Sequence, residues 1–205
     1  MIYLAIALVI GYGFGCLQSA YVVGRVFGKI DIREHGSGNA GMTNVSRVLG
    51  VKLGAFVLVF DAIKAIVAMM LVTYIFYGQV WPYVPYAAAI VAGLGVVLGH
   101  CFPFYLKFKG GKGVASALGL VIYFDWRVLA ICLSIGLVSV ILTRYISLAS
   151  LASVIALFIT TTIFYHNEPV IMFAMWVVVA IILVRHRANI KRLISGNENK
   201  FRFKR

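Results

Sequence analysis

The feature that most constrains this chain is a series of long apolar segments that together fill most of its length. Of the 205 residues, 62% are hydrophobic and only 12% are charged, whereas soluble globular chains contain about 45–50% apolar residues. The segments are continuous and do not alternate with polar residues, which favours membrane-spanning helices over the strands of a β-barrel. We therefore expect an all-α, polytopic integral membrane helical bundle, in which residues 1–205 form a single membrane domain.

Seven apolar segments are the expected spans, and the fourth is short. They cover residues 2–24, 53–77, 85–106, 114–124, 127–143, 147–165 and 170–184. The 11 residues of 114–124 rise only about 16 Å as a helix, against about 30 Å for a hydrocarbon core, so this segment either begins inside the preceding loop or continues into 127–143. A continuous helix would bury Asp125 and Arg127 in the bilayer, which is costly, whereas a turn with Trp126 at the interface is favourable.

The basic residues favour seven transmembrane helices, with the N-terminus outside and the C-terminus in the cytoplasm. In that topology only two of the 19 Lys and Arg residues lie away from the inner side: Lys64 within a span and Arg127 in an outer turn. Cytoplasmic loops carry an excess of Lys and Arg, so seven spans are preferred to six. The net charge of +13 then reflects topology and contact with anionic membrane lipid, not a nucleic-acid partner. Residues 196–205 are expected to form a basic surface tail.

Acidic and sulfur-bearing residues suggest neither a metal nor a cofactor. The six acids show no paired-carboxylate cluster, which argues against a metal-dependent reaction. The three cysteines, Cys16, Cys101 and Cys132, lie in or beside apolar segments without metal-ligand spacing, so we expect buried thiols.

Residues 108–116, F-K-G-G-K-G-V-A-S, form a segment that we call the glycine loop. Glycine lets backbone N–H groups approach an anion and lysine adds positive charge, so phosphate is the expected ligand and the glycines should matter chiefly for holding it. A helix beginning near Val114 would direct its positive end at that ligand. Gly113 stands where a nucleotide P-loop needs Ser or Thr. The alternative is a basic membrane loop with helix-breaking glycines. The candidate ligands are Lys109, Gly110, Gly111, Lys112 and Gly113.

The inner loop of residues 31–47 also carries groups that bind a polyoxygen anion. It intersperses glycines with hydroxyl and amide side chains, which form hydrogen bonds with phosphate. Arg47 is the expected bidentate clamp, since its planar guanidinium matches the anion, and a short helix beginning near Thr43 would place it about one turn in. The alternative is glycine turns with a helix cap at Thr43 or Asn44. The candidate ligands here are Ser37, Asn39, Thr43, Asn44 and Arg47.

Two further inner segments add polar groups. Ser147 lies at the third inner turn, and His186 and Asn189 lie three residues apart on one face of a helix near the C-terminus. His100 precedes an aromatic belt and is interpreted as a packing residue. All the inner segments thus carry phosphate-type groups and the outer loops carry none, which indicates a site at the inner membrane surface, open to cytosol and lipid.

These segments together resemble the bacterial integral-membrane acyl-phosphate:glycerol-3-phosphate acyltransferases, the PlsY family. The matching stretches are S-x-x-x-x-x-R (19–25), D-I-R-x-x-G-S-G-N-x-G-x-T-N-x-x-R (31–47), G-H-x-F-P-x-x-x-x-F-K-G-G-K-G-V-A-S (99–116), T-R-Y-x-S-L (143–148) and H-R-x-N-I-x-R-L (186–193). They follow the family's order and cover nearly the whole chain. One small departure is Ser116, where Thr is common in the family.

The resemblance implies an enzyme of the bacterial inner membrane with its active site on the cytoplasmic face. It moves an acyl chain from acyl-phosphate to the sn-1 hydroxyl of glycerol 3-phosphate, giving 1-acylglycerol 3-phosphate (lysophosphatidate) and phosphate. This is the first acylation of phospholipid synthesis. A soluble enzyme that produces acyl-phosphate is an expected functional partner.

The residues also bear on the mechanism. No H-x-x-x-x-D motif follows any of the four histidines, and no Ser–His–Asp set is apparent. A mixed anhydride already has a good leaving group, so positioning and charge neutralisation can suffice, and we expect no covalent acyl-enzyme. The hydroxyl proton passes to the donor's phosphate or to His186, and both routes stay open. The expected catalytic residues are His186, Asn189, Ser37 and Arg47.

The main alternative is an inner-membrane transporter for organic phosphates. Such a protein places polar groups near mid-bilayer on broken helices, whereas only Asp61 and Lys64 lie deep in a span of this chain. They are three residues apart and can face one another. A functional charge pair and a structural ion pair facing the bundle both stay open.

Overall fold

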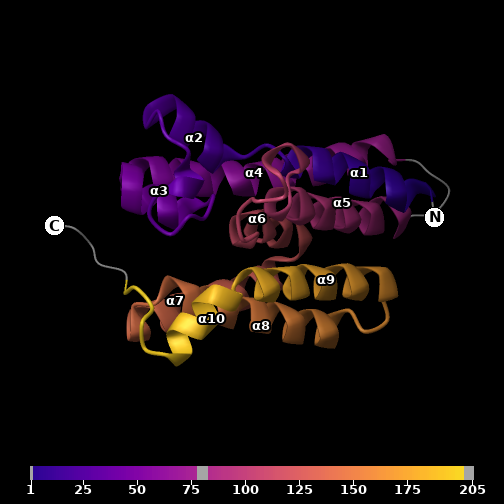
Figure 1. Ribbon diagram of the computed structural model, residues 1–205. Coiled ribbons are helices and arrows are strands. Elements are labelled where there is room, and N and C mark those ends of the chain that lie inside the picture. Colours follow the sequence, from indigo (N-terminus) through magenta and orange to yellow (C-terminus); the bar gives the residue numbers. More distant parts are fainter. Residues whose placement is uncertain (1, 78–82, 201–205) are drawn as a thin grey trace. The chain divides into compact units, whose positions relative to one another are not determined.

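The computed structural model describes residues 2–77 and 83–200, and every regular element in these ranges is a helix. The helices form two compact units, Met1–Phe124 and Asp125–Arg205 (Figure 1), and each is described by itself. The expectation of a single membrane domain stays a prediction. The expected outer turn at 78–85 lies mostly outside the described residues, and so does the end of the expected tail at 201–205.

The described part of the first unit consists of α-helices and two short 3-10 helices. They are α1 (Ile2–Gly15), α2 (Ser19–Phe27), η1 (Ile32–Glu34), α3 (Met42–Leu49), α4 (Val51–Ile75), α5 (Tyr83–Cys101), η2 (Phe104–Leu106) and α6 (Val114–Phe124).

Helices α1 and α5 pack with their backbones in contact. A Cβ added to Gly11 would lie 2.7 Å from the carbonyl carbon of Ala92, and one added to Gly99 would lie 2.9 Å from the nitrogen of Cys16. Only glycine allows this approach, which is typical of tightly packed membrane helices. Since the contacts advance in the same direction along both helices, α1 and α5 are parallel.

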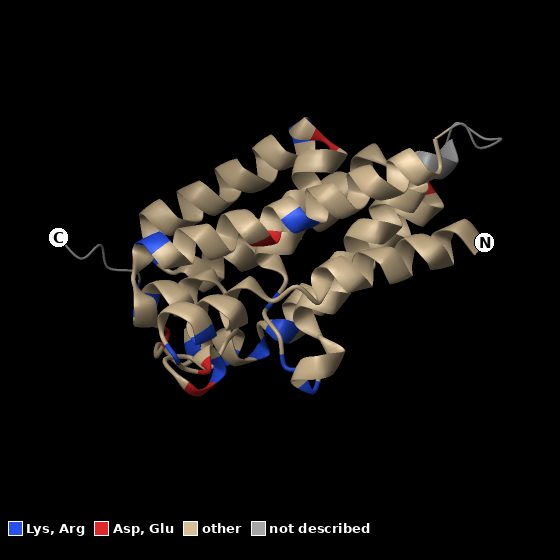
Figure 2. Ribbon diagram, turned by 90° about the horizontal axis from the view of Figure 1, so that it is seen from above, with Lys and Arg blue, Asp and Glu red and all other residues tan. Residues whose placement is uncertain are grey.

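Helices α4 and α6 run in the opposite direction to α5. Lys64 lies beside His100 and Met69 lies beside Gly93, and α6 follows the direction of α4. The end of α1, the start of α4, the end of α5 and the start of α6 therefore lie at one end of the first unit. Apart from Lys64, the described Lys and Arg residues of this unit lie in α2, η1 and α3, at the start of α4 and in the segments between helices at that end, and most blue positions in Figure 2 lie away from the N-terminus.

A break between α1 and α2 interrupts the first apolar segment, which the sequence had indicated as one span. Its carbonyl groups accept hydrogen bonds from side chains distant in sequence. Lys64 Nζ donates to Gly15 O at 3.2 Å and to Leu17 O at 2.8 Å, and Tyr105 Oη donates to Cys16 O at 2.7 Å. Because an unsatisfied backbone carbonyl in a membrane costs several kcal/mol, these bonds stabilise the break.

The second unit contains α7 (Trp126–Thr143), α8 (Ile146–Phe164), α9 (Pro169–Arg185) and α10 (Arg187–Ile194). The Asp125 carboxylate caps α7, accepting hydrogen bonds from the Arg127 N–H at 2.7 Å and from Tyr165 Oη at 2.7 Å. Hydrogen bonding from Arg127 lowers the pKa of Asp125 to about 2. The expected break at this aspartate is confirmed, because α6 ends one residue before it and α7 begins one residue after it.

Within the described residues, five spans are long and apolar enough to cross a membrane, and the first of them, Ile2–Phe27, counts α1 and α2 together. A sixth is obtained when α9 and α10, bent by 56°, are counted as one span, while α6 is shorter. Six of the seven expected segments each coincide with one helix, and the first, 2–24, covers α1 and most of α2. The number of crossings and the orientation of the termini stay predictions. The three cysteine thiols are buried, as expected.

Candidate active site

The loop before α3 is organised by the side chain of Asn44. Its Oδ1 accepts hydrogen bonds from the Ser37 N–H at 2.7 Å and from Ser37 Oγ at 3.1 Å. Its Nδ2 donates to the carbonyls of Ile32 at 3.0 Å and His35 at 2.9 Å. An amide side chain has two donor hydrogens and one acceptor oxygen, so Asn44 is fully engaged within the loop. We infer that Asn44 holds Ser37 in place and does not itself contact a ligand.

The short helix expected near Thr43 is present as α3. It begins at Met42 with Gly41 as its cap and no side-chain cap, so the alternative of a Thr or Asn cap is wrong. Arg47 lies in the last turn of α3. Its side chain is exposed and makes no hydrogen bond or ion pair with the described residues. Of the other candidates, Ser37 is exposed, and Asn39 and Thr43 are partly buried.

The first inner loop contacts the chain around the glycine loop. The Asp31 carboxylate accepts a hydrogen bond from Arg33 Nη2 at 2.7 Å, and Arg33 Nη1 donates to Leu106 O at 3.2 Å. Hydrogen bonding from Arg33 lowers the pKa of Asp31 to about 2, so both groups are charged at neutral pH. A Cβ on Gly111 would lie 2.6 Å from Ala40 O. The structure thus brings the two candidate loops of the first unit together.

Two glycine N–H groups of the glycine loop are used within the chain. Gly110 N–H donates to Cys101 O at 3.2 Å, and Gly111 N–H donates to His100 O at 3.0 Å. A Cβ on Gly110 would lie 2.6 Å from Pro103 Cδ. These glycines seat the loop against the end of α5, where a side chain does not fit. The expectation that they matter chiefly for holding phosphate stays a prediction.

The rest of the glycine loop retains the features expected of an anion site. Helix α6 begins at Val114, as predicted. Gly113 has a φ of 89°, in the left-handed region that favours glycine. Lys109 is exposed and Lys112 is partly buried. The N–H groups at the start of α6, together with these lysines, are the part of the loop suited to a phosphate.

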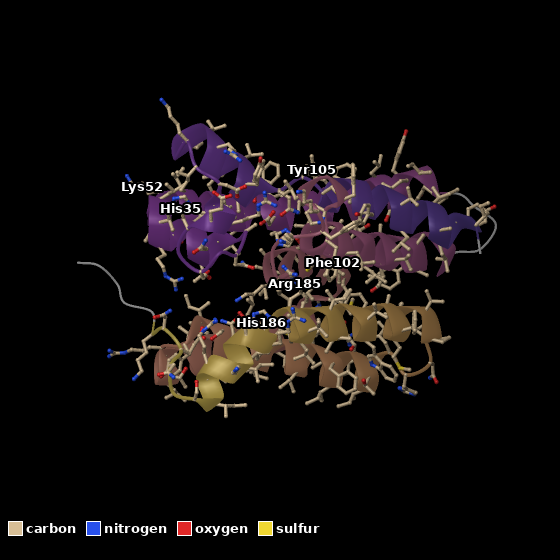
Figure 3. All side chains as sticks on the ribbon, viewed as in Figure 1. His35, Lys52, Phe102, Tyr105, Arg185 and His186 are labelled. Carbon is tan, nitrogen blue, oxygen red and sulfur yellow. The ribbon has the colours of Figure 1, made fainter. Side chains whose placement is uncertain are left out.

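In the second unit, His186 lies where α9 meets α10 (Figure 3). Its side chain is 2% exposed, and Nδ1 lies 2.8 Å from the carbonyl oxygen of Ile182. Because a carbonyl only accepts hydrogen bonds, Nδ1 carries the proton and Nε2 of the neutral ring is an acceptor. An imidazole held in this tautomer can receive a hydroxyl hydrogen bond.

Ser147 and Asn189 converge on the carboxylate of Glu198. Ser147 Oγ and Asn189 Nδ2 donate to Oε1 at 3.0 and 2.8 Å, and Arg192 Nε donates to Oε2 at 2.7 Å. Burial opposes the negative charge, but the three hydrogen bonds outweigh it and lower the pKa of Glu198. The sequence interpretation placed this residue in a surface tail. A single acid within a basic segment was the signal that could have revealed it.

Each unit therefore holds part of the expected residue set. The first holds Ser37, Asn39, Thr43, Asn44, Arg47, Lys109, Gly110, Gly111, Lys112 and Gly113, and the second holds Ser147, His186 and Asn189. Apolar helices with phosphate-type groups in the segments between them define a polytopic helical membrane protein suited to a phosphorylated ligand.

The comparison with known proteins gives the family. Residues 5–196 match the model of the glycerol-3-phosphate acyltransferases, and the chain belongs to this family. The chain is 37% identical over 198 residues to the glycerol-3-phosphate acyltransferase of Thermoanaerobacter pseudethanolicus, covering 97% of this chain and 96% of the relative. It is 38% identical over 195 residues to glycerol-3-phosphate acyltransferase 2 of Bacillus anthracis, covering 95% and 97%.

Solved structures agree with this assignment. The chain resembles the crystal structure of PlsY (YgiH), an integral membrane glycerol 3-phosphate acyltransferase, in its glycerol 3-phosphate form, with a TM-score of 0.86 and 33% identity over 97% of this chain and 96% of that one. The lysophosphatidic acid form gives a TM-score of 0.83 at 33% identity, covering 97% and 95%. The predicted all-α integral membrane fold and PlsY-type acyltransferase class are confirmed.

Proposed function

We propose that this enzyme transfers an acyl chain from acyl-phosphate to the sn-1 hydroxyl of glycerol 3-phosphate. The products are 1-acylglycerol 3-phosphate and inorganic phosphate, in the first acylation of bacterial phospholipid synthesis. The observation that carries the proposal is the similarity to two forms of one enzyme, named for glycerol 3-phosphate and for lysophosphatidic acid. These are the acceptor and the product of such a transfer.

The proposed site lies on the cytoplasmic face of the bacterial inner membrane. In the first unit, the exposed guanidinium of Arg47 and the lysines at the start of α6 supply positive charge for phosphate groups. Ser37, held by the Asn44 amide at 3.1 Å, supplies a hydroxyl. Charge neutralisation of this kind is what an acyl-phosphate needs from a protein, since its phosphate is already a good leaving group.

The proposed reaction is a direct transfer without a covalent acyl-enzyme. The hydroxyl oxygen of glycerol 3-phosphate attacks the acyl carbon, a carbon–oxygen bond to glycerol forms, and the bond from the acyl carbon to the phosphate oxygen breaks. The hydroxyl proton leaves with the departing phosphate in a substrate-assisted step, or passes first to His186 Nε2. The Nδ1 hydrogen bond to Ile182 O at 2.8 Å supports an acceptor role for Nε2, which orients the hydroxyl in either route.

The transporter alternative has weaker support. It depends on Asp61 and Lys64, which are 1% and 3% exposed and form an ion pair at 2.8 Å. A permeation pathway needs polar groups that face a water-filled cavity, whereas this pair is packed inside the first unit.

The test uses the purified protein in lipid, with palmitoyl-phosphate and glycerol 3-phosphate. We expect lysophosphatidate and phosphate to appear in equal amounts, and no product from palmitoyl-CoA. Phosphate release without lysophosphatidate, or activity with acyl-CoA alone, would contradict the proposal.

A further inference from the structure

A buried charged pair in the middle of α4 has no place in the proposed reaction. Asp61 and Lys64 lie about one turn apart, and Lys64 Nζ is 2.8 Å from Asp61 Oδ1. Removing two charges from water is expensive, and their mutual attraction often only balances that cost. The other contacts of the pair therefore indicate what it does.

The Lys64 ammonium reaches three further acceptors. Two are carbonyl oxygens at the break between α1 and α2, those of Gly15 at 3.2 Å and Leu17 at 2.8 Å. The third is Nδ1 of His100 at 3.1 Å. The same nitrogen lies 3.6 Å from Asp61 Oδ1, which is longer than a hydrogen bond. Since an ammonium group has only donor hydrogens, we take Nδ1 of His100 as an acceptor of one of the three Lys64 hydrogens. The neutral ring therefore carries its proton on Nε2.

His100 packs against the glycine loop at Gly111. Its carbonyl oxygen receives the Gly111 N–H at 3.0 Å and Gln18 Nε2 at 3.1 Å. Its ring touches the same glycine: a Cβ on Gly111 would lie 2.8 Å from His100 Cε1, and nearer still to Nε2. The orientation and tautomer of this ring thus decide whether Nε2, the ring atom nearest to Gly111, is a hydrogen-bond donor or an acceptor.

We propose that Lys64 is a positioning residue of the glycine loop. It holds the His100 ring, which contacts Gly111, as the tautomer protonated at Nε2, and so fixes the position of the loop. Asp61 supplies the carboxylate that pairs with the Lys64 ammonium at 2.8 Å. The proposal rests on the proposed function, because it assigns the glycine loop to a substrate phosphate. Under this proposal, removing the Asp61–Lys64 pair weakens substrate binding, whereas removing a purely structural ion pair would change only the stability of the protein.

The test separates charge balance from positioning with the variants Asp61→Asn, Lys64→Met and their combination. Lys64→Met alone leaves a buried carboxylate without its partner, so it should destabilise the protein most. The combined variant is neutral at both positions, and we expect its melting temperature to return to within about 3 °C of wild type. Its KM for at least one phosphate substrate should nevertheless rise about tenfold, with kcat within about twofold. Lys52→Met, at the exposed start of α4, is the matched control.

The second measurement is the 15N spectrum of histidine-labelled protein, with the His100 signal identified among the four histidines by its loss in His100→Gln. In wild type we expect a neutral ring protonated at Nε2, and in the combined variant a mixture of tautomers. A wild-type ring protonated at Nδ1, or a combined variant with unchanged KM values, would overturn the proposal. If the combined variant does not fold, the wild-type spectrum still decides. A well-folded wild type with the expected tautomer and no acyltransferase activity would refute the proposed function and leave the Lys64–His100 network standing.

Discussion

The replacement Glu198→Gln tests the part of the site that only the structure revealed. The carboxylate accepts from two candidate ligands, Ser147 and Asn189, through one oxygen and from Arg192 through the other. A glutamine has one acceptor oxygen, so its NH₂ group must face at least one of these donors. The substitution therefore removes a hydrogen bond and places two donors against each other.

The magnitude follows from these contacts. Hydrogen bonds to charged groups contribute about 1.5–3 kcal/mol, and the value here is reduced because the Arg192 side chain is 40% exposed. We expect a loss of about 1–2 kcal/mol, which lowers the melting temperature by about 2–8 °C for a chain of this size. Because Ser147 and Asn189 lose their common anchor, kcat/KM for acyl transfer should fall about tenfold.

The assay is thermal unfolding in detergent together with lysophosphatidate formation in lipid, with Glu168→Gln at the α8–α9 turn as the matched control. The same carboxylate predicts a pH effect. Its pKa is lowered by the hydrogen bonds, so its stabilisation is present above the unfolded value of about 4.3 and is lost as the pH falls through the folded value. Glu198→Gln should lack this acid-dependent loss. A variant that binds glycerol 3-phosphate more tightly than wild type would refute the reasoning, since the carboxylate would then compete with phosphate for Ser147 and Asn189.

Three further outcomes are expected. His186→Gln should reduce kcat by about 10²–10⁴-fold without changing the melting temperature, while His166→Gln on the other side of the second unit leaves turnover unchanged; near-normal turnover of the first variant would exclude a catalytic role. Gly111→Ala should lower the melting temperature by an amount equivalent to about 1–3 kcal/mol, because its Cβ would lie 2.6 Å from Ala40 O. A variant as stable as wild type with weakened substrate binding would instead show that this glycine serves to bind phosphate. Asp125→Asn should lower the melting temperature at pH 7 but not below about pH 2. The pKa of Asp125 is about 2 in the folded protein and about 3.9 in the unfolded chain, so the stabilisation by the Asp125 carboxylate is lost as the pH falls from about 3.9 to about 2.

Much of the helical framework was predictable because the length of an apolar segment and the residues that end a helix can be recognised from adjacent positions in the sequence. The break at Asp125 follows from a charged pair beside a tryptophan, and the short helix near Thr43 follows from glycine-rich sequence before it. Both appear in the structure, with α7 beginning at Trp126 and α3 at Met42. These signals are local, so they can be interpreted without knowledge of packing.

The break between α1 and α2 was not predictable in the same way. Residues 15–18 contain no proline and interrupt no apolar pattern strongly enough to end a helix. The break is stabilised by three side chains that donate to its carbonyl groups: Gln18 from within the break, and Lys64 and Tyr105 from elsewhere in the chain. Two of these donors lie more than 45 residues away along the chain, so only the fold brings them to the break.

The two histidines beside candidate groups show why the chemistry of such a site needs the structure. In the sequence, His100 and His186 each follow an apolar segment, and neither has a partner within a recognisable motif. In the structure, Nδ1 of His100 lies 3.1 Å from Lys64 Nζ, whereas Nδ1 of His186 lies 2.8 Å from Ile182 O. With Lys64 as the proposed donor, the first ring has a donor at Nε2, and the second ring, which donates to a carbonyl, has an acceptor there. A donor at Nε2 is suited to supporting a loop that binds an anion, and an acceptor at Nε2 is suited to contact with an attacking hydroxyl. The two histidines therefore take opposite roles because the neighbours of their Nδ1 atoms differ.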